Sequence, residues 1–300
     1  MGTRWSLRYA ADADPAMLQG AVERLLAGIV ASMSNWEPES DISRFGNTPA
    51  GSWVTIPGPL FQVVEAAIDV AEATDGAFDP TVAALVDRWG FGPAPFAGIP
   101  DQDEVATLQR QTGWRRIKLD RAAQRVRQPG GIGLDVSGIA KGYAVDALAA
   151  LCRSRGIYHF LAEIGGELAG EGIRPDGQPW WVEVEQPPLS QLGPIRVALH
   201  GLAVATSGDY RRSFGYRGRL YSHSIDPRTG VPVDNGVASV TVFHASAMHA
   251  DALATALTVM GAEAGLRFAT DRGLAAYMIV REGGRVREAM SPAFALMLEE

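Results

Sequence analysis

Residues 134–143 read Leu-Asp-Val-Ser-Gly-Ile-Ala-Lys-Gly-Tyr, and this stretch decides the fold class because strand, turn and helix signals follow one another in it. The apolar alternation of residues 132–136 predicts a strand. The Ser-Gly step that follows predicts a turn, and residues 138–155 have the apolar spacing of a helix. A chain built from such steps combines helices with sheets.

Similar signals continue on both sides of this stretch. On its N-terminal side the sequence predicts helices at residues 17–33, 57–73, 81–89 and 101–111, a polar loop at residues 35–49, and strands at residues 116–119 and 123–127. On its C-terminal side it predicts strands at residues 158–164, 180–185, 195–199, 203–206 and 239–244, a polar, basic stretch at residues 209–219, helices at residues 246–260 and 263–270, and a hairpin of residues 275–280 and 285–290. We find no repeat of fixed period and no long linker. The prediction is an α+β fold: a single domain over residues 1–300, made of mixed sheets with packed helices in one or two lobes.

The charge balance and the cysteine count exclude several classes of function. The chain has 300 residues, 27 basic and 34 acidic, so its formal net charge is −7 and nucleic acid is not an expected partner. The single cysteine, Cys152, excludes an internal disulfide and a cysteine-rich zinc site, and its apolar neighbours predict a buried thiol.

Hydropathy and the N-terminal residues give expectations about location. The mean hydropathy is zero, and no run approaches the ~18 consecutive apolar residues of a spanning helix, so we expect no transmembrane segment. Residues 1–9 lack the apolar core of a secretory signal. The expected location is the cytoplasm, and a periplasmic lipoprotein with a trimmed leader is the alternative.

Asp251 and Thr255 lie four residues apart in the predicted helix of residues 246–260, so they share one helical face. A carboxylate and a hydroxyl in this arrangement can present oxygen atoms to a hard cation such as Mg²⁺. The residues at positions 250, 252, 254 and 256 are all alanine, which we expect to leave room for a bulky ligand. The alternative is that Asp251 only stabilises the first helical turn through the macrodipole.

Residues 134–143 also supply candidates for binding a phosphate group. The helix start after Asp135 leaves backbone N–H groups that can bind phosphate, and Lys141 would add a positive charge. The spacing of a Walker A loop is absent. An ordinary capped helix is the alternative.

Residues 221–230 read Tyr-Ser-His-Ser-Ile-Asp-Pro-Arg-Thr-Gly, and the last five of them predict a tight turn. His223 lies just before this turn. It is a candidate general base because imidazole titrates near neutral pH, and a purely structural role is the alternative. The four other histidines are predicted to be structural.

A fourth segment, residues 76–81, reads Gly-Ala-Phe-Asp-Pro-Thr and lies between two predicted helices. A helix stop followed by an N-cap from Asp79 explains its local signals. A functional role depends on which other residues meet it in the fold.

These four segments occur in the same chain as Met-Gly-Thr at residues 1–3 and Ala-Thr-Ser-Gly-Asp-Tyr at residues 205–210. With these six motifs in this order, the chain resembles the ApbE family of FAD:protein FMN transferases from its first residue to beyond Gly261. The resemblance implies a Mg²⁺-dependent enzyme that moves the FMN half of FAD onto a threonine or serine hydroxyl of a target flavoprotein and releases AMP. FAD is then a substrate, and the acceptor flavoprotein is the partner.

The resemblance also implies site residues. It places the Mg²⁺ ligands at Asp251, Thr255 and the backbone carbonyl of Gly138, and it gives catalytic roles to His223, beside the reacting phosphate, and to Lys141. The FAD contacts that it implies are Met1, Trp36, Ala77, Phe78, Asp79, Asp135, Lys141 and Ile225. Family members often have tyrosine at the position of Trp36, so we expect the aromatic contact without the hydroxyl.

Two other functions stay open from the sequence. FAD hydrolysis to FMN and AMP would use the same groups, with water as the nucleophile. A flavin-binding protein without catalytic activity is the alternative from a different class, and failure to bind a metal would favour it.

Overall fold

The computed structural model describes residues 2–188 and 190–298, and the chain divides into two compact units. Unit 1 comprises Met1–Leu26, Lys141–Arg211 and Asn235–Glu300, and unit 2 comprises Ala27–Ala140 and Arg212–Asp234. Each unit is therefore assembled from chain segments that are distant in the sequence.

Unit 1 is built on one antiparallel sheet of seven strands, in the order β1-β5-β6-β9-β14-β15-β16. The strands are β1 (Trp5–Tyr9), β5 (Phe160–Ile164), β6 (Glu167–Glu171), β9 (Leu202–Gly208), β14 (Val237–His244), β15 (Ala275–Glu282) and β16 (Arg285–Met290). Strand β1, at the start of the chain, pairs with β5 and forms one edge of the sheet, so residues far apart in the sequence meet at this edge.

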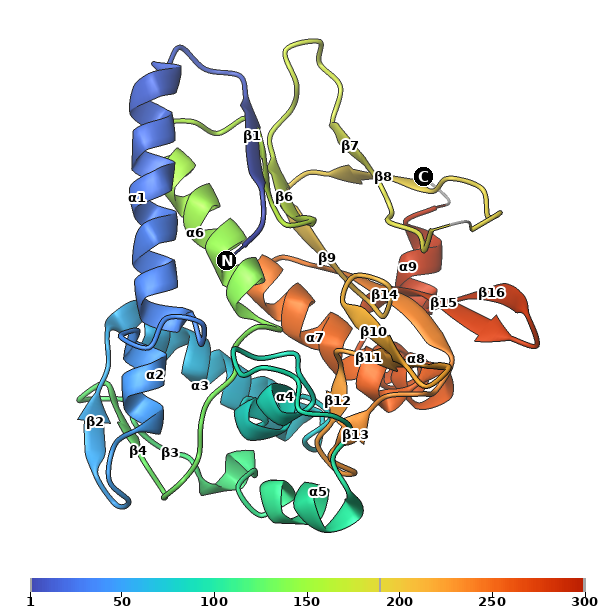
Figure 1. The fold of residues 1–300 in the computed structure, drawn as a ribbon. Helices are drawn as coiled ribbons and strands as arrows, with labels where there is room; N and C mark the ends of the chain where they lie inside the picture. The colour runs from blue at the N-terminus through green and yellow to red at the C-terminus, as the bar shows by residue number, and fades with distance from the viewer. Residues whose placement is uncertain (1, 189, 299–300) are drawn as a thin grey trace. The chain divides into compact units, whose positions relative to one another are not determined.

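Helices cover one face of this sheet and a hairpin covers part of the other. The further elements of unit 1 are α6 (Ala140–Ser154), α7 (Ala247–Met260), α8 (Ala262–Asp271), α9 (Pro292–Leu296), β7 (Trp180–Glu183) and β8 (Arg196–Leu199). Helix α7 packs along β9 and β14 (Figure 1). Because successive side chains of a strand point to opposite faces, Val240 and Val242 pack with α7, whereas Phe243 packs with Val182 of β7 and Phe294 of α9.

Unit 2 contains one long helix, several short helices and three small sheets. Its helices are α2 (Asp41–Gly46), α3 (Gly58–Ala73), α4 (Ala83–Arg88) and α5 (Gln102–Gln109), with a 3₁₀ turn at Trp114–Arg116. Its strands are β2 (Trp53–Thr55), β3 (Lys118–Asp120) and β4 (Arg125–Arg127) in one sheet, and the pairs β10 (Ser213–Tyr216) with β11 (Arg219–Ser222) and β12 (Ile225–Asp226) with β13 (Val231–Pro232). Trp89, Phe91, Val105 and Ile225 belong to one buried apolar cluster of this unit.

The predicted helices and the C-terminal hairpin are confirmed, with shifts of a few residues at their ends. The fold class is also confirmed, because helices and mixed sheets make up the chain. The division into a single domain over residues 1–300 stays a prediction.

The predicted strand at residues 132–136 is wrong. Ile132, Leu134 and Val136 are buried as the alternation suggested, but no strand is formed there. The side chain of Gln128 donates to the Ile132 carbonyl at 2.9 Å, and the Asp135 N–H donates to the Pro80 carbonyl at 2.7 Å. The alternating apolar residues are those whose side chains are buried. Hydrogen bonds to other loop residues, and not to a neighbouring strand, satisfy the backbone groups of this segment.

One further prediction is corrected, and one hairpin was not predicted. The predicted loop at residues 35–49 contains α2, which buries Ile42 and Phe45 and is capped by the Ser40 side chain. The polar, basic stretch at residues 209–219, for which the sequence predicted no element, contains β10, which forms a hairpin with β11. In both places a short element has too few apolar residues to show a clear periodicity.

Helix α1 (Pro15–Met33) is the one helix, within residues 2–188 and 190–298, that is long and apolar enough to cross a membrane. Length and composition alone give this result, and buried core helices and signal sequences pass the same test.

Candidate active site

Lys141 of α6 lies in a cluster of charged side chains within unit 1. Its Nζ donates to Glu167 Oε1 and lies 3.4 Å from Asp251 Oδ1. The Lys141 side chain is 31% exposed, whereas the Glu167 side chain is fully buried. Burial lowers the pKa of Lys141, but the carboxylates of Asp251 and Glu167 outweigh it, so the pKa is raised and Lys141 is a cation at neutral pH.

Glu167 and Arg211 belong to this cluster although the sequence did not single them out. Arg211 Nη1 lies 3.5 Å from Glu167 Oε1, and Arg211 also pairs with Glu185. Burial raises the pKa of Glu167, and Lys141 and Arg211 act against that shift. Among the described residues, Glu167 Oε2 is buried and has no hydrogen-bond partner. The signal that could have pointed to Glu167 is a glutamate directly after two glycines, three residues beyond the predicted strand of residues 158–164.

Asp251 and Thr255 lie on one face of α7, as predicted, in different surroundings. Asp251 is buried, and its Oδ2 accepts a hydrogen bond of 3.0 Å from the backbone N–H of Gly142. Thr255 is half-buried, and its hydroxyl makes no hydrogen bond within the described part of the chain. By contrast, the hydroxyl of Thr258 on the same helix donates to the Ala254 carbonyl. The oxygen of Thr255 is therefore the one of these two hydroxyl oxygens that is not engaged by its own helix.

The alanines around Asp251 do not leave room for a ligand, so that expectation is wrong. The alanines at positions 250, 252, 254 and 256 are fully buried. Their small side chains allow close packing instead: a Cβ added to Gly142 would lie 2.1 Å from the Ala247 carbonyl oxygen. Helices α6 and α7 therefore meet almost backbone to backbone, and this contact places Lys141 beside Asp251.

The chemistry of these donors fits a hard cation. Asp251 and Thr255 offer a carboxylate and a hydroxyl oxygen, which Mg²⁺ prefers. Within residues 2–188 and 190–298, no group of three or more His, Cys, Asp or Glu side chains is placed to hold a metal ion. Gly138, whose backbone carbonyl is the third predicted ligand, belongs to unit 2, and its role as a ligand stays a prediction.

The predicted FAD contacts Ala77, Phe78 and Asp79 lie in unit 2 and are buried. Asp79 Oδ1 accepts from the Thr81 N–H at 2.8 Å and from the Thr81 hydroxyl at 2.6 Å. Burial raises the pKa of Asp79, and the hydrogen bonds from Thr81 oppose the shift. Asp79 does not cap α4, because the N-cap position is Val82 and makes no side-chain cap bond. The N-cap explanation of this segment is therefore wrong.

Hydrogen bonds bring three of the predicted segments of unit 2 together. The Asp135 N–H donates to the Pro80 carbonyl, directly after Asp79. Asn35, which precedes Trp36, donates from its side chain to the Leu134 carbonyl at 3.0 Å. Asp135 Oδ1 accepts from the Ser137 N–H at 2.7 Å, which shapes the turn that contains Gly138.

Trp36 is an exposed aromatic side chain, with 56% of its surface accessible. The guanidinium of Arg212 lies 5.9 Å from the centre of its ring. An exposed indole next to a cation can stack on a planar ligand, and the flavin contact of Trp36 stays a prediction.

His223 directly follows β11 and is half-buried. Its backbone N–H donates to the Arg212 carbonyl, and its Nδ1 lies 3.0 Å from the same carbonyl oxygen. Because a carbonyl can only accept, Nδ1 must be the donor, and in the neutral ring Nε2 then carries the lone pair. The ring packs edge-on against Phe91, which also belongs to the apolar cluster of Ile225. The aromatic cluster thus fixes both His223 and Ile225.

The predicted site residues divide between the units. Lys141, Asp251 and Thr255 belong to unit 1, and the remaining described ones belong to unit 2. Met1 lies outside the described residues.

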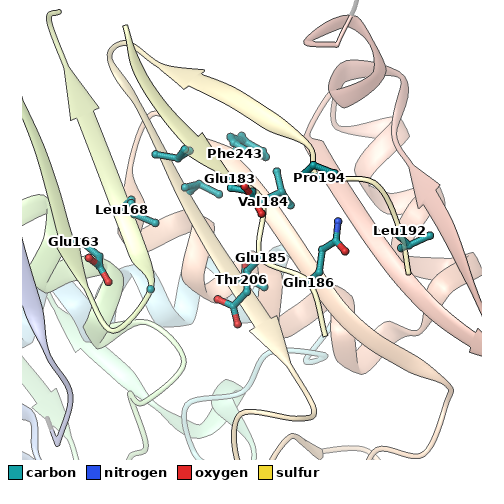
Figure 2. A pocket seen from close by; sticks show the side chains of 13 residues that line it. Glu163, Leu168, Glu183, Val184, Glu185, Gln186, Leu192, Pro194, Thr206 and Phe243 are labelled. Carbon is teal, nitrogen blue, oxygen red and sulfur yellow. The ribbon is translucent and has the colours of Figure 1, made fainter. Parts of the chain in front are cut away.

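Unit 1 also has a cavity of about 710 Å³ on the sheet face that carries Leu168, Val204 and Phe243 (Figure 2). Its wall includes Glu185, the partner of Arg211. Glu167 is the neighbour of Leu168 in β6 and therefore points to the opposite face. None of the predicted site residues within residues 2–188 and 190–298 lines this cavity.

Comparison with known proteins gives one consistent result. The pattern of the ApbE family matches residues 1–278. The chain is 37% identical over 305 residues to the FAD:protein FMN transferase of Vibrio cholerae serotype O1, covering 100% of this chain and 91% of the relative. It is 32% identical to the FAD:protein FMN transferase of Escherichia coli strain K12, covering 99% of this chain and 87% of the relative. The solved structure of the flavinyl transferase ApbE of Pseudomonas stutzeri, in its apo form, superposes with a TM-score of 0.93 at 36% identity, covering 100% of this chain and 95% of that one. The resemblance noted in the sequence is confirmed, and the chain belongs to the ApbE family.

Proposed function

We propose that this chain is a Mg²⁺-dependent FAD:protein FMN transferase that attaches FMN to a threonine or serine hydroxyl of an acceptor flavoprotein and releases AMP. The names of its relatives support the transfer of FMN from FAD to a protein. The observation that carries the proposal furthest is the cluster on α6 and α7, in which Lys141 lies beside Asp251 and the unengaged hydroxyl of Thr255 is one turn away. The ammonium of Lys141 and a Mg²⁺ ion held by the nearby oxygen donors would both attract the negative charge of a pyrophosphate group.

The metal would be held by Asp251 and Thr255, with the carbonyl of Gly138 as the predicted third protein ligand. When bound, Mg²⁺ neutralises charge that develops on the pyrophosphate oxygens. Lys141 assists as a fixed positive charge. Glu167 is buried and bonded to Lys141, so it holds the ammonium in place.

The transfer step forms one bond and breaks one bond at phosphorus, and a side chain of this protein accepts the released proton. The acceptor hydroxyl oxygen forms a bond to the FMN-side phosphorus of FAD, and the bond from that phosphorus to the bridging oxygen breaks. AMP leaves with the bonding electron pair. Nε2 of His223 takes the proton of the hydroxyl, since Nδ1 is used as the donor to the Arg212 carbonyl.

The direct test is to incubate the protein with FAD, Mg²⁺ and a candidate acceptor flavoprotein and to measure the acceptor by mass spectrometry. We expect an added FMN mass on a threonine or serine, and AMP in equal amount. Free FMN and AMP without modification of the acceptor would show FAD hydrolysis instead. If no FAD is consumed, the result would favour the alternative of a flavin-binding protein without catalytic activity.

A further inference from the structure

We propose that the β10–β11 hairpin, residues 213–222, docks the acceptor protein and selects an extended, carboxylate-bearing segment of it. The inference rests on the proposed function and adds the chemistry of the partner. It follows from the hairpin part of the basic stretch at residues 209–219, to which neither an FAD contact nor a metal ligand is assigned.

The hairpin carries one positive charge, that of Arg217, which no carboxylate of the described residues pairs with. Four arginines lie within residues 211–219 of a chain whose net charge is −7. Arg211 is engaged by Glu185, and Arg219 lies 2.8 Å from Asp234. Arg212 and Arg217 form no ion pair with a carboxylate within residues 2–188 and 190–298, although both lie near aromatic rings. Arg212 precedes the hairpin and donates to the Phe91 carbonyl at 2.9 Å, so Arg217 is the hairpin guanidinium that remains to meet an anionic partner.

Exposed apolar side chains lie next to these charges. Leu220 of β11 is 61% exposed. Phe96, itself exposed, lies 4.8 Å from the ring centre of Phe214 and 5.8 Å from that of Tyr216. Single exposed apolar residues are common on proteins, but here Leu220 on the hairpin and Phe96 against it lie close to the charge of Arg217.

The aromatic side chains beneath make the hairpin a rigid platform. Phe214 stacks on Tyr221 at 5.3 Å across the two strands, and Tyr221 stacks on the buried Trp89 at 5.8 Å. A preorganised surface loses little conformational entropy on binding.

The backbone of the hairpin can also pair with an incoming segment. Among the described residues, β10 and β11 pair only with each other, so each has an outer edge of backbone donors and acceptors. An extended peptide can add to such an edge as a further strand. Strand β11 continues directly into His223, so a segment bound along it lies near the residue that we assign as the base.

The test uses Arg217, which touches neither His223 nor any residue assigned to FAD or metal. The variants are Arg217→Glu, Arg217→Lys and, as the matched control, Arg285→Glu. Arg285 begins β16, directly after the turn of the other hairpin, and has no ion pair among the described residues, so its reversal changes the net charge equally.

We expect Arg217→Glu to raise the KM for the acceptor roughly tenfold and to weaken its dependence on salt, because the charge acts on docking. The kcat and the KM for FAD should stay within about twofold of the wild type, as should all parameters of Arg217→Lys and Arg285→Glu. An unchanged acceptor KM in Arg217→Glu, or an equal rise in Arg285→Glu, overturns the proposal.

A binding experiment separates this proposal from the proposed function. The probes are a short fluorescent peptide with a central threonine flanked by glutamates and its counterpart with glutamines, each titrated into the full-length protein. We expect tighter binding of the glutamate peptide, with the preference lost in Arg217→Glu and kept in Arg285→Glu. Equal binding of both peptides, or binding of neither, overturns the docking proposal. A preference for glutamate in a protein that transfers no FMN would retain the docking surface and refute the transfer.

Discussion

Asp251 is a single residue that serves both the packing of two helices and the proposed metal chemistry. Its carboxylate accepts the Gly142 N–H and faces Lys141. Asp251→Asn keeps an oxygen for Gly142 and removes the charge, so it separates the two roles. We expect Mg²⁺ affinity of the FAD complex to fall by at least ~10-fold with little change in Tm. Calorimetric titration of Mg²⁺ measures this, and an unchanged affinity would remove Asp251 from the metal site.

Thr255 and Thr258 give a matched pair on the same helix. Thr255→Val removes a hydroxyl that no described residue engages, so we expect Mg²⁺ affinity to fall while stability is retained. Thr258→Val removes a buried hydroxyl that donates to the Ala254 carbonyl, so we expect a loss of about 1 kcal/mol of stability and no change in Mg²⁺ affinity. Equal effects of the two variants on Mg²⁺ binding would contradict the assignment.

His223 tests the proposed base. In His223→Asn the side-chain amide can still donate to the Arg212 carbonyl, but the Nε2 lone pair is lost. Single-turnover FMN transfer should fall by ~10² to 10⁴, with FAD affinity little changed, because a general base contributes about this much. A variant that transfers at nearly the wild-type rate would give His223 a structural role.

Cys152 shows how burial governs reactivity. The thiol is fully buried, as predicted, and burial raises its pKa from 9.0 to about 11. The folded state therefore holds the thiol proton more tightly than the unfolded state. This contribution to the free energy of unfolding is complete below pH 9.0 and is lost as the pH rises towards about 11.

Two measurements check the behaviour of Cys152. A thiol reagent at pH ~8 should label the native protein far more slowly than the denatured protein, because the thiolate fraction is on the order of one thousandth. Urea unfolding should also show that the wild type loses roughly 2 kcal/mol more than Cys152→Ala between pH ~8 and pH ~10.5. Rapid native labelling, or a stability difference that does not depend on pH, would be inconsistent with the buried thiol.

At the scale of elements, the contact between α6 and α7 decides where the charged cluster forms. Asp146 of α6 accepts from the Ser246 hydroxyl and from the N–H groups of Ala247 and Met248. The first turn of α7 is thus capped by a side chain from another helix as well as by Ser246 itself. The sequence predicted where α7 begins, but the role of Asp146 depends on a contact between residues about a hundred positions apart.

Gly142 makes this contact possible, and its replacement is a prediction at the same scale. Gly142→Ala would place a Cβ 2.1 Å from the Ala247 carbonyl oxygen, against backbone that cannot yield easily. We expect a loss of about 3 kcal/mol or more of stability, measured by urea unfolding. The control is Gly28→Ala in α1, where a Cβ meets nothing within 4 Å, and a gain of ~0.5 to 1 kcal/mol is expected. Similar effects of the two changes would show that α6 and α7 do not pack this closely.

At the scale of the whole molecule, the sequence by itself determined the helices, the main C-terminal strands, the α+β class and the membership of the ApbE family. These are local properties: periodicity, turn residues and motifs act within about ten residues of chain. Prediction from the sequence failed at residues 132–136, where the alternating apolar side chains are buried but the backbone pairs with no neighbouring strand. It also missed short elements such as α2 and β10.

Only the tertiary structure decided the order of the seven strands, the pairing of β1 with β5 and the burial of Glu167 between Lys141 and Arg211. Lys141 and Asp251 are 110 positions apart, and a chain of local signals does not specify that they meet. They do so because a glycine on α6 and an alanine-rich α7 allow two backbones to approach, which is a property of complementary surfaces and not of either segment alone.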